Sequence, residues 1–229
     1  MKILESRAIS TVGPAKEYFI RIDPEDISST LSAIHQALMD FSWLKNFDEE
    51  YMVQSYQQRA QITINHIKKN FDECSEEKLT KDAGEYVVSE LSREAIVSDL
   101  GYLDIPLSEL LGKKISGNPG FDFHSQNCST DTVIFGEAKY ISAKSAYLSA
   151  IKQINEFIAV RKDISDIADL DRFCTPQSLR RASNGVKGFA AAFSAKSTPS
   201  NRLIQTIQAR SEYAELLKYE EIILVAVNL

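Results

Sequence analysis

PGFDFHSQNCSTDTVIFGEAKY, residues 119–140, is the stretch that decides the fold. It alternates apolar and polar residues, passes through a loop of small polar residues, and ends in a β-branched and aromatic run at residues 132–140. That composition predicts two strands, the second of them buried on at least one face. Because side chains alternate along a strand, one face of the second strand carries four residues: Val133, Phe135, Glu137 and Lys139.

Two charges on the core-like face of an apolar strand need a physical explanation. Buried charges are costly unless they are paired or bind a metal ion. Glu137 and Lys139 are two residues apart, so their side chains project from the same side about 7 Å apart. Asp122, which the first strand carries, adds a second carboxylate. The residues therefore predict a site with two oxygen ligands and one cation.

Mg²⁺ prefers this donor set, because it is bound by one or two carboxylates, retained waters and the phosphate oxygens of a substrate. A bound metal lowers the pKa of a coordinated water and steadies charge that develops on phosphorus. Lys139 is then expected to orient the attacking water or to neutralise the phosphate. We therefore expect Asp122 and Glu137 to be metal ligands for Mg²⁺, with Mn²⁺ as the alternative ion.

Asp122 followed by Glu137-Ala138-Lys139 resembles the D…E-x-K signature of the PD-(D/E)xK nuclease superfamily. Two segments, Gly120-Phe121-Asp122-Phe123 and Phe135-Gly136-Glu137-Ala138-Lys139, are more particularly similar to the nuclease subunits of the Hachiman anti-phage defence system. The resemblance covers residues 80–229 best. It implies a mixed α/β fold with a restriction-endonuclease-like core at 73–229, and an N-terminal, mostly helical accessory segment at 1–72.

The resemblance also implies an activity and a partner. It predicts a metal-dependent DNA endonuclease of low sequence specificity that acts as the effector subunit of a bacterial anti-phage defence complex. In this family the partner is a helicase that restrains the nuclease until phage-associated DNA damage is sensed. The superfamily often places a further catalytic glutamate on the helix that precedes the core strands.

Two residues compete for the role of that helix-borne glutamate. In the expected helix after residue 80, an apolar stripe contains Gly84, Val87 and Leu91. Glu85 and Glu90 lie about 110° to either side of this stripe, so periodicity does not choose between them. The pair Gly84-Glu85 fits better, since a small residue lets the helix approach the sheet. Glu85 is the predicted fourth catalytic residue, and a solvent-facing carboxylate is the alternative.

The net charge of −6 argues at first against a nucleic-acid partner, but the charges are segregated. Residues 172–211 contain seven basic side chains and no acidic one, which leaves 19 basic and 32 acidic residues elsewhere. Such a basic segment is typical of a surface that binds a phosphate backbone; a solvated basic surface is the alternative. The expected nucleic-acid-binding residues are Arg180, Arg181, Lys187, Lys196 and Arg202. Lys113 and Lys114 are further loop charges near the expected phosphate path.

Composition places the chain among ordinary globular proteins, with 44% hydrophobic and 25% charged residues. No apolar run approaches the ~20 residues that span a bilayer, and the first ten residues lack the apolar core of a signal peptide. The three cysteines are scattered without CxxC pairing, so neither a disulfide framework nor a zinc site is expected. We therefore expect a cytoplasmic protein with no membrane contact.

The remaining pattern predicts the elements around this core. A strand is expected at 16–22, followed by helices from 25 and over 51–69. A helix capped by Ser142 or Ser145 is expected to run to 162, with helical segments at 163–171 and 201–218. Residues 188–192 are expected to form a compact apolar insertion, and 221–229 a buried strand.

Two other interpretations stay open. In the first, the chain has a nuclease fold without catalytic activity and serves as a DNA-binding or adaptor subunit, because a fold does not imply a function. Alternatively, E-x-K is a chance triplet in an unrelated α/β protein. His124 shares the Asp122 face, so it either acts beside the metal or is a polar neighbour without chemistry.

Overall fold

A six-stranded mixed sheet forms the centre of the protein in the computed structural model, which describes residues 1–10, 13–75, 79–112 and 120–229. The strand order is β1-β2-β6-β5-β4-β3. The strands are β1 (Lys2–Ile9), β2 (Lys16–Asp23), β3 (Phe123–Asn127), β4 (Thr132–Lys139), β5 (Gly188–Ala195) and β6 (Glu221–Asn228). The mixed α/β class expected from the sequence is therefore confirmed.

The direction of the strands divides the sheet into a parallel centre and two antiparallel edges. β2, β6, β5 and β4 run parallel, while β1 pairs antiparallel with β2, and β3 antiparallel with β4. The carboxyl ends of the four parallel strands consequently meet at one edge of the sheet. In open α/β sheets this edge is where ligands usually bind.

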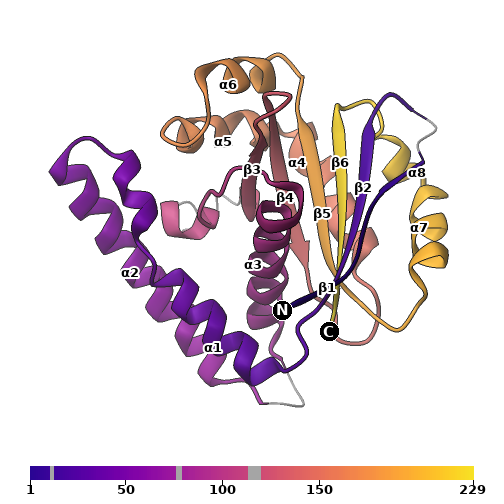
Figure 1. Cartoon of the computed structure of the whole chain (residues 1–229), viewed down its shortest axis with the longest axis horizontal. Helices are drawn as coiled ribbons and strands as arrows, with labels where there is room; N and C mark the ends of the chain where they lie inside the picture. Colours follow the sequence, from indigo (N-terminus) through magenta and orange to yellow (C-terminus); the bar gives the residue numbers. More distant parts are fainter. Residues whose placement is uncertain (11–12, 76–78, 113–119) are drawn as a thin grey trace.

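Helices cover both faces of the sheet (Figure 1). The α-helices are α1 (Ile27–Leu38), α2 (Glu50–Asp72), α3 (Lys81–Leu100), α4 (Tyr147–Ala159), α5 (Lys162–Leu170), α6 (Pro176–Ser183), α7 (Ser200–Gln208) and α8 (Ser211–Ala214). Two 3₁₀ turns, η1 (Ser42–Asn46) and η2 (Ser108–Leu111), complete the described elements. None of the described helices is both long and apolar enough to cross a membrane.

Two hydrophobic cores lie on opposite faces because successive strand residues point in opposite directions. On β5, Ala190 and Ala192 face the core built with α1, α2 and α3. Phe189 and Phe193 face the other core, which α4 and α7 cover. All eight residues of β5 are buried, so this central strand is apolar on both faces, as parallel strands usually are.

The N-terminal part of the chain contributes to two regions. Strands β1 and β2 belong to the same sheet as the C-terminal strands, since β2 pairs with β6 over seven residues. Helices α1 and α2 pack on each other and extend to the left of the sheet in Figure 1. The expected division at residue 72 stays a prediction about domain organisation.

Several sequence expectations are corrected by the structure. The apolar insertion expected at 188–192 is the first part of β5, whose alanines satisfy a buried strand although alanine favours helices in isolation. The helix expected over 201–218 is divided, because Arg210 takes an extended conformation between α7 and α8. Neither serine caps α4, which begins after Ala146; the Ser145 hydroxyl accepts a hydrogen bond from Lys196 N–H instead. Lys113 and Lys114 lie outside the described residues.

Candidate active site

Asp122 is held against the centre of the E-A-K triplet. Its Oδ2 accepts a 2.7 Å hydrogen bond from the backbone N–H of Ala138, and its own N–H donates to the Gly136 carbonyl. Strand β3 begins at Phe123, so the Asp122 side chain supplies the acceptor that a longer strand would supply from its backbone. Asp122 is 7% exposed, which makes this contact part of the buried end of the β3–β4 pair.

Glu137 and Lys139 form an ion pair on the same stretch of β4. The Lys139 Nζ lies 2.7 Å from Glu137 Oε1, and Glu137 is fully buried, while 17% of the Lys139 side chain is exposed. Both residues lie near the carboxyl end of β4, at the edge where the parallel strands end. The structure thus pairs the two charges that the sequence placed on one face.

Helix α3 brings a third carboxylate to this pair. The Glu85 Oε1 lies 3.9 Å from Lys139 Nζ and also 3.9 Å from Lys81 Nζ. Glu90, the competing residue, is buried elsewhere and contacts the Arg93 guanidinium at 2.5 Å. Of the two glutamates that periodicity could not separate, Glu85 is therefore the one beside the β4 charges.

A glycine permits this approach of helix to sheet. A Cβ placed on Gly84 would lie 2.3 Å from the Tyr140 ring, a distance that no real contact tolerates. Tyr140 directly follows β4, so the absence of a side chain at 84 lets α3 rest against the end of that strand. The close approach positions the neighbouring Glu85.

The charges of the cluster act together on Lys139. Burial taken alone would lower the pKa of this ammonium group, but the surrounding carboxylates and one hydrogen bond raise it above its ordinary value. The carboxylates, in order of effect, are Glu137, Asp122 and Glu85. Lys139 is consequently a permanent cation at neutral pH, suited to electrostatic stabilisation and not to proton abstraction.

The donor set fits a divalent cation in kind. Three carboxylates surround one ammonium, so a bound cation would offset the remaining negative charge. Among the described ranges, no group of three or more His, Cys, Asp and Glu side chains is arranged to hold a metal ion. The fit therefore rests on Asp122 and Glu137, because a Mg²⁺ site commonly uses one or two protein carboxylates.

His124 has partners of its own. Its Nδ1 lies 3.1 Å from Ser108 Oγ and its Nε2 lies 3.2 Å from Asp166 Oδ2, which also accepts the N–H of Phe121. Ser108, His124 and Asp166 are each no more than 1% exposed, so their contacts form a buried hydrogen-bond network. This network ties β3, which begins directly after Asp122, to η2 and α5.

Ser108 and Asp166 were not predicted from the sequence. A signal for Asp166 was present, because Asp163, Asp166 and Leu170 recur at helical spacing and all three are buried in α5. Acidic residues on the apolar stripe of a helix indicate buried polar partners. No comparable periodic signal marks Ser108, which lies in a single 3₁₀ turn.

The structure separates the five expected nucleic-acid-binding residues. Arg180 and Arg181 lie in the last turn of α6, and Lys187 is buried in an ion pair with Asp163. Lys196 follows the far end of β5, roughly 25 Å from Lys187 for an eight-residue strand. Arg202 comes next in the chain, on α7. Only Lys196 and Arg202 belong to the edge that carries Glu137 and Lys139.

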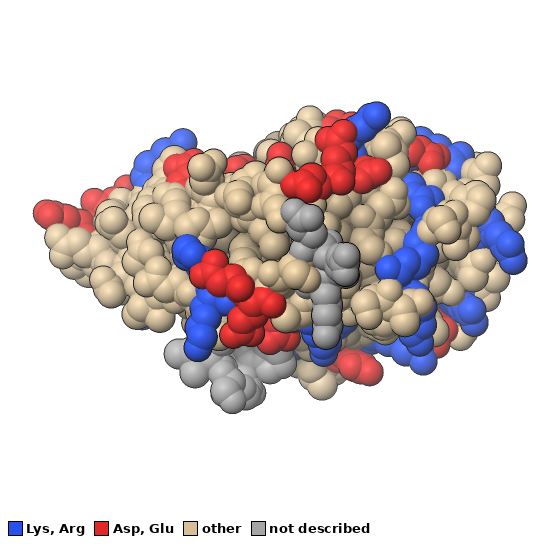
Figure 2. All heavy atoms as spheres, turned by 90° about the horizontal axis from the view of Figure 1, so that it is seen from below, with Lys and Arg blue, Asp and Glu red and all other residues tan. Residues whose placement is uncertain are grey.

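A second feature of this edge is a cavity of about 420 Å³. It is lined by hydroxyl groups and one guanidinium and by no carboxylate; its polar residues are Ser145, Tyr147, Ser197, Thr198, Arg202 and Thr206. Figure 2 views the protein from below this edge, and Lys and Arg side chains gather on its right, towards α7 and α8. This edge of the sheet thus combines the charged cluster at the end of β4 with a hydroxyl-rich cavity that contains one arginine.

Comparison of the chain with protein-family models, curated proteins and solved structures found no match.

Proposed function

We propose that the chain is a Mg²⁺-dependent deoxyribonuclease with a core of the PD-(D/E)xK type. The observation that carries this proposal is the convergence of Asp122 on the backbone of the Glu137-Ala138-Lys139 triplet, with Glu85 beside Lys139. Carboxylates that hold a metal ion and an ammonium that stabilises developing charge are groups that support phosphodiester hydrolysis. Helix α3 precedes the strand pair β3–β4, and α4 and the parallel strand β5 follow it, so the cluster lies between two helices along the chain.

Each residue of the cluster has a distinct role in this proposal. Asp122 and Glu137 hold the metal, which when bound supplies positive charge to the phosphate and a lowered pKa to its water. Lys139 presents its ammonium to the scissile phosphate or to the attacking water. Glu85, whose Oε1 lies 3.9 Å from the Lys139 ammonium, keeps that ammonium oriented through their contact.

DNA is the proposed substrate, and the hydroxyl-rich cavity that contains Arg202 suits a polyanionic ligand. Arg202 and the surrounding hydroxyls are donors that suit phosphate oxygens. Contacts of this kind fix a duplex in position without reading its bases, which agrees with cleavage of low sequence specificity.

The proposed biological setting rests on the resemblance of Gly120–Phe123 and Phe135–Lys139 to the Hachiman nuclease subunits. In that setting the chain is an effector subunit of an anti-phage defence complex, and a helicase partner restrains it. Copurification of the chain with the product of a neighbouring helicase gene tests this part. Two proteins that elute independently would remove the regulatory proposal and leave the nuclease proposal intact.

The decisive experiment compares conservative variants. Glu137→Gln keeps the shape of the side chain and removes its charge, and Glu220→Gln is an exposed control outside the cluster. Purified protein is incubated with plasmid DNA and Mg²⁺, with chelated metal as a second control. We expect cleavage by the parent and by Glu220→Gln only. Equal cleavage by Glu137→Gln would show that the cluster is not the active site.

One observation favours a catalytically silent DNA-binding or adaptor subunit as the second candidate. Glu137 is fully buried and already paired with Lys139, and neither described cavity includes Asp122, Glu137 or Lys139. An adaptor would bind DNA equally well with and without Mg²⁺ and leave it intact. Calorimetric titration with Mg²⁺ separates the two, because heat that disappears in Glu137→Gln favours the nuclease.

A further inference from the structure

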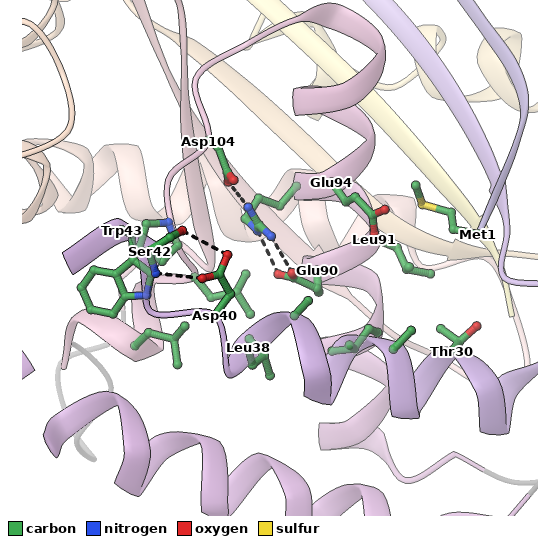
Figure 3. Close-up of a pocket in the computed structure, with 17 residues that line it drawn as sticks. Met1, Thr30, Leu38, Asp40, Ser42, Trp43, Glu90, Leu91, Glu94 and Asp104 are labelled. Carbon is green, nitrogen blue, oxygen red and sulfur yellow. Dashed lines mark hydrogen bonds and ion pairs between the residues drawn. The ribbon is translucent and has the colours of Figure 1, made fainter. Parts of the chain in front are cut away.

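A cavity of about 390 Å³ opens between α1, α3 and the segment that leads into η2 (Figure 3). Its floor is apolar and includes Ile34, Leu38, Leu91, Leu107 and Leu110. Cavities of this size and lining are typical of sites for small organic molecules. None of its lining residues belongs to the candidate active site.

The polar residues of the cavity are mostly acidic. Four carboxylates line it (Asp40, Glu90, Glu94 and Asp104), and Arg93 is the one basic side chain among the lining residues. These side chains sum to −3, and the terminal ammonium of Met1, which also lines the cavity, brings the total to −2. A low-dielectric floor beneath such a rim concentrates the negative potential and favours a cation.

Arg93 does not neutralise the whole rim. Its guanidinium contacts both oxygens of Glu90, at 2.5 and 2.9 Å, and also pairs with Asp104. Asp40 accepts hydrogen bonds from the N–H and hydroxyl of Ser42, which are neutral donors. Asp40 and Glu94 therefore keep their charges, and Figure 3 shows them on opposite sides of Glu90.

A buried donor at one end of the cavity gives an independent indication of a ligand. Trp43 is only 9% exposed, and its Nε1 has no hydrogen-bond acceptor among the described residues. The nitrogen-bearing edge of the indole is turned toward Asp40 and the cavity in Figure 3. Buried N–H groups without an acceptor are uncommon in folded proteins, because leaving them unpaired is costly.

We propose that this cavity, which we name the α1–α3 cavity, binds a small organic cation. The ligand carries a guanidinium that meets Asp40 and Glu94, a short apolar stem that lies on the leucine floor, and a carbonyl oxygen within reach of Trp43. L-argininamide combines these three groups and is the probe. L-citrullinamide is its matched control, since a neutral urea replaces the guanidinium at nearly the same shape.

The first test measures binding of both probes to the full chain by calorimetry. We expect L-argininamide to bind and L-citrullinamide to bind at least about fivefold more weakly, the difference that two rim ion pairs supply. Equal affinity of the two probes, or no heat with either at 10 mM, would overturn the proposal.

The second test uses two pairs of variants. Asp40→Asn with Glu94→Gln removes the rim charge, and Asp171→Asn with Glu220→Gln removes two exposed charges elsewhere. We expect affinity for L-argininamide to fall about fivefold in the first double variant only. A similar loss in both would show attraction to the acidic surface in general and reject a defined site.

Steric variants test whether the ligand enters the cavity. Ala37 lines it from α1, whereas the neighbouring Gln36 is exposed and does not. Ala37→Phe should fill the opening and abolish binding without changing charge, while Gln36→Phe should bind as the parent does. Unchanged binding in Ala37→Phe, with both variants folded by circular dichroism, would exclude the α1–α3 cavity.

Discussion

The carboxylate of Asp122 accepts the backbone N–H of Ala138 at 2.7 Å, so a side chain completes the hydrogen bonding of the strand that carries Glu137 and Lys139. One residue thereby has two roles: its carboxylate satisfies a buried backbone donor, and its charge contributes to the acidic cluster. These roles can be separated, because asparagine retains one acceptor oxygen for the Ala138 N–H, while an uncharged NH2 group replaces the other oxygen.

Substitution of Asp122 tests this separation. Asp122→Ala leaves the Ala138 N–H without its acceptor, and we expect the free energy of unfolding to fall by about 1–3 kcal/mol. Asp122→Asn should lose less stability, yet both variants should lose cleavage by ~100-fold or more. Urea denaturation and a plasmid cleavage assay measure the two effects. Full activity in Asp122→Asn would show that the carboxylate charge is not used.

The pairing of Glu137 with Lys139 predicts strong coupling between their substitutions. Lys139→Met leaves a fully buried carboxylate without its cation, which typically costs about 3–5 kcal/mol. Adding Glu137→Gln removes that charge, so the double variant should be more stable than Lys139→Met alone. Denaturation of the parent, both single variants and the double variant gives the coupling energy. Simple additivity would contradict the ion pair.

The raised pKa of Lys139 predicts the pH range in which its ammonium group stabilises the fold. The folded-state pKa lies above the ordinary value of 10.5, so stabilisation by the ammonium is present below about pH 10.5 and lost as pH rises through the folded value. The stability difference between the parent and Lys139→Met should therefore stay constant between about pH 6 and pH 9. Denaturation across this range checks it. A difference that shrinks near neutral pH would mean that Lys139 loses its proton there.

The sequence was most informative where chemistry and periodicity coincide. Alternation on β4 placed Glu137 and Lys139 on one face, and the proximity of α3 to the sheet followed from Gly84. The basic segment was less informative, because its sequence does not show which edge of the sheet each basic side chain reaches. Strand β5 takes the chain across the sheet between Lys187 and Lys196, so neighbours in the segment end on opposite edges. Strand β1 was missed since it is a half-exposed edge strand with little apolar alternation.

Gly84 offers a test of how helix position affects the cluster. Gly84→Ala places a methyl group against the Tyr140 ring, so α3 and the end of β4 must separate. We expect a loss of about 1–3 kcal/mol in stability, as for other overpacked sites, together with reduced cleavage. Asp82→Ala on the exposed side of the same helix is the control. Adding Tyr140→Leu to Gly84→Ala should restore part of the stability; absence of any rescue would mean that the ring is not the obstacle.

Two exposed arginines distinguish the carboxyl edge of the sheet from the opposite edge. Arg202 lines the hydroxyl-rich cavity at the same edge of the sheet as the candidate active site, whereas Arg180 lies at the end of α6. Arg202→Gln should weaken DNA binding and reduce the slope of log affinity against log salt by about 1, because one phosphate contact is lost. Arg180→Gln removes the same charge and should leave that slope unchanged. Fluorescence anisotropy with a labelled duplex, in Ca²⁺ to suppress cleavage, measures both slopes. Equal changes in the two variants would mean that DNA responds to overall charge and does not follow the edge where Glu137 and Lys139 lie.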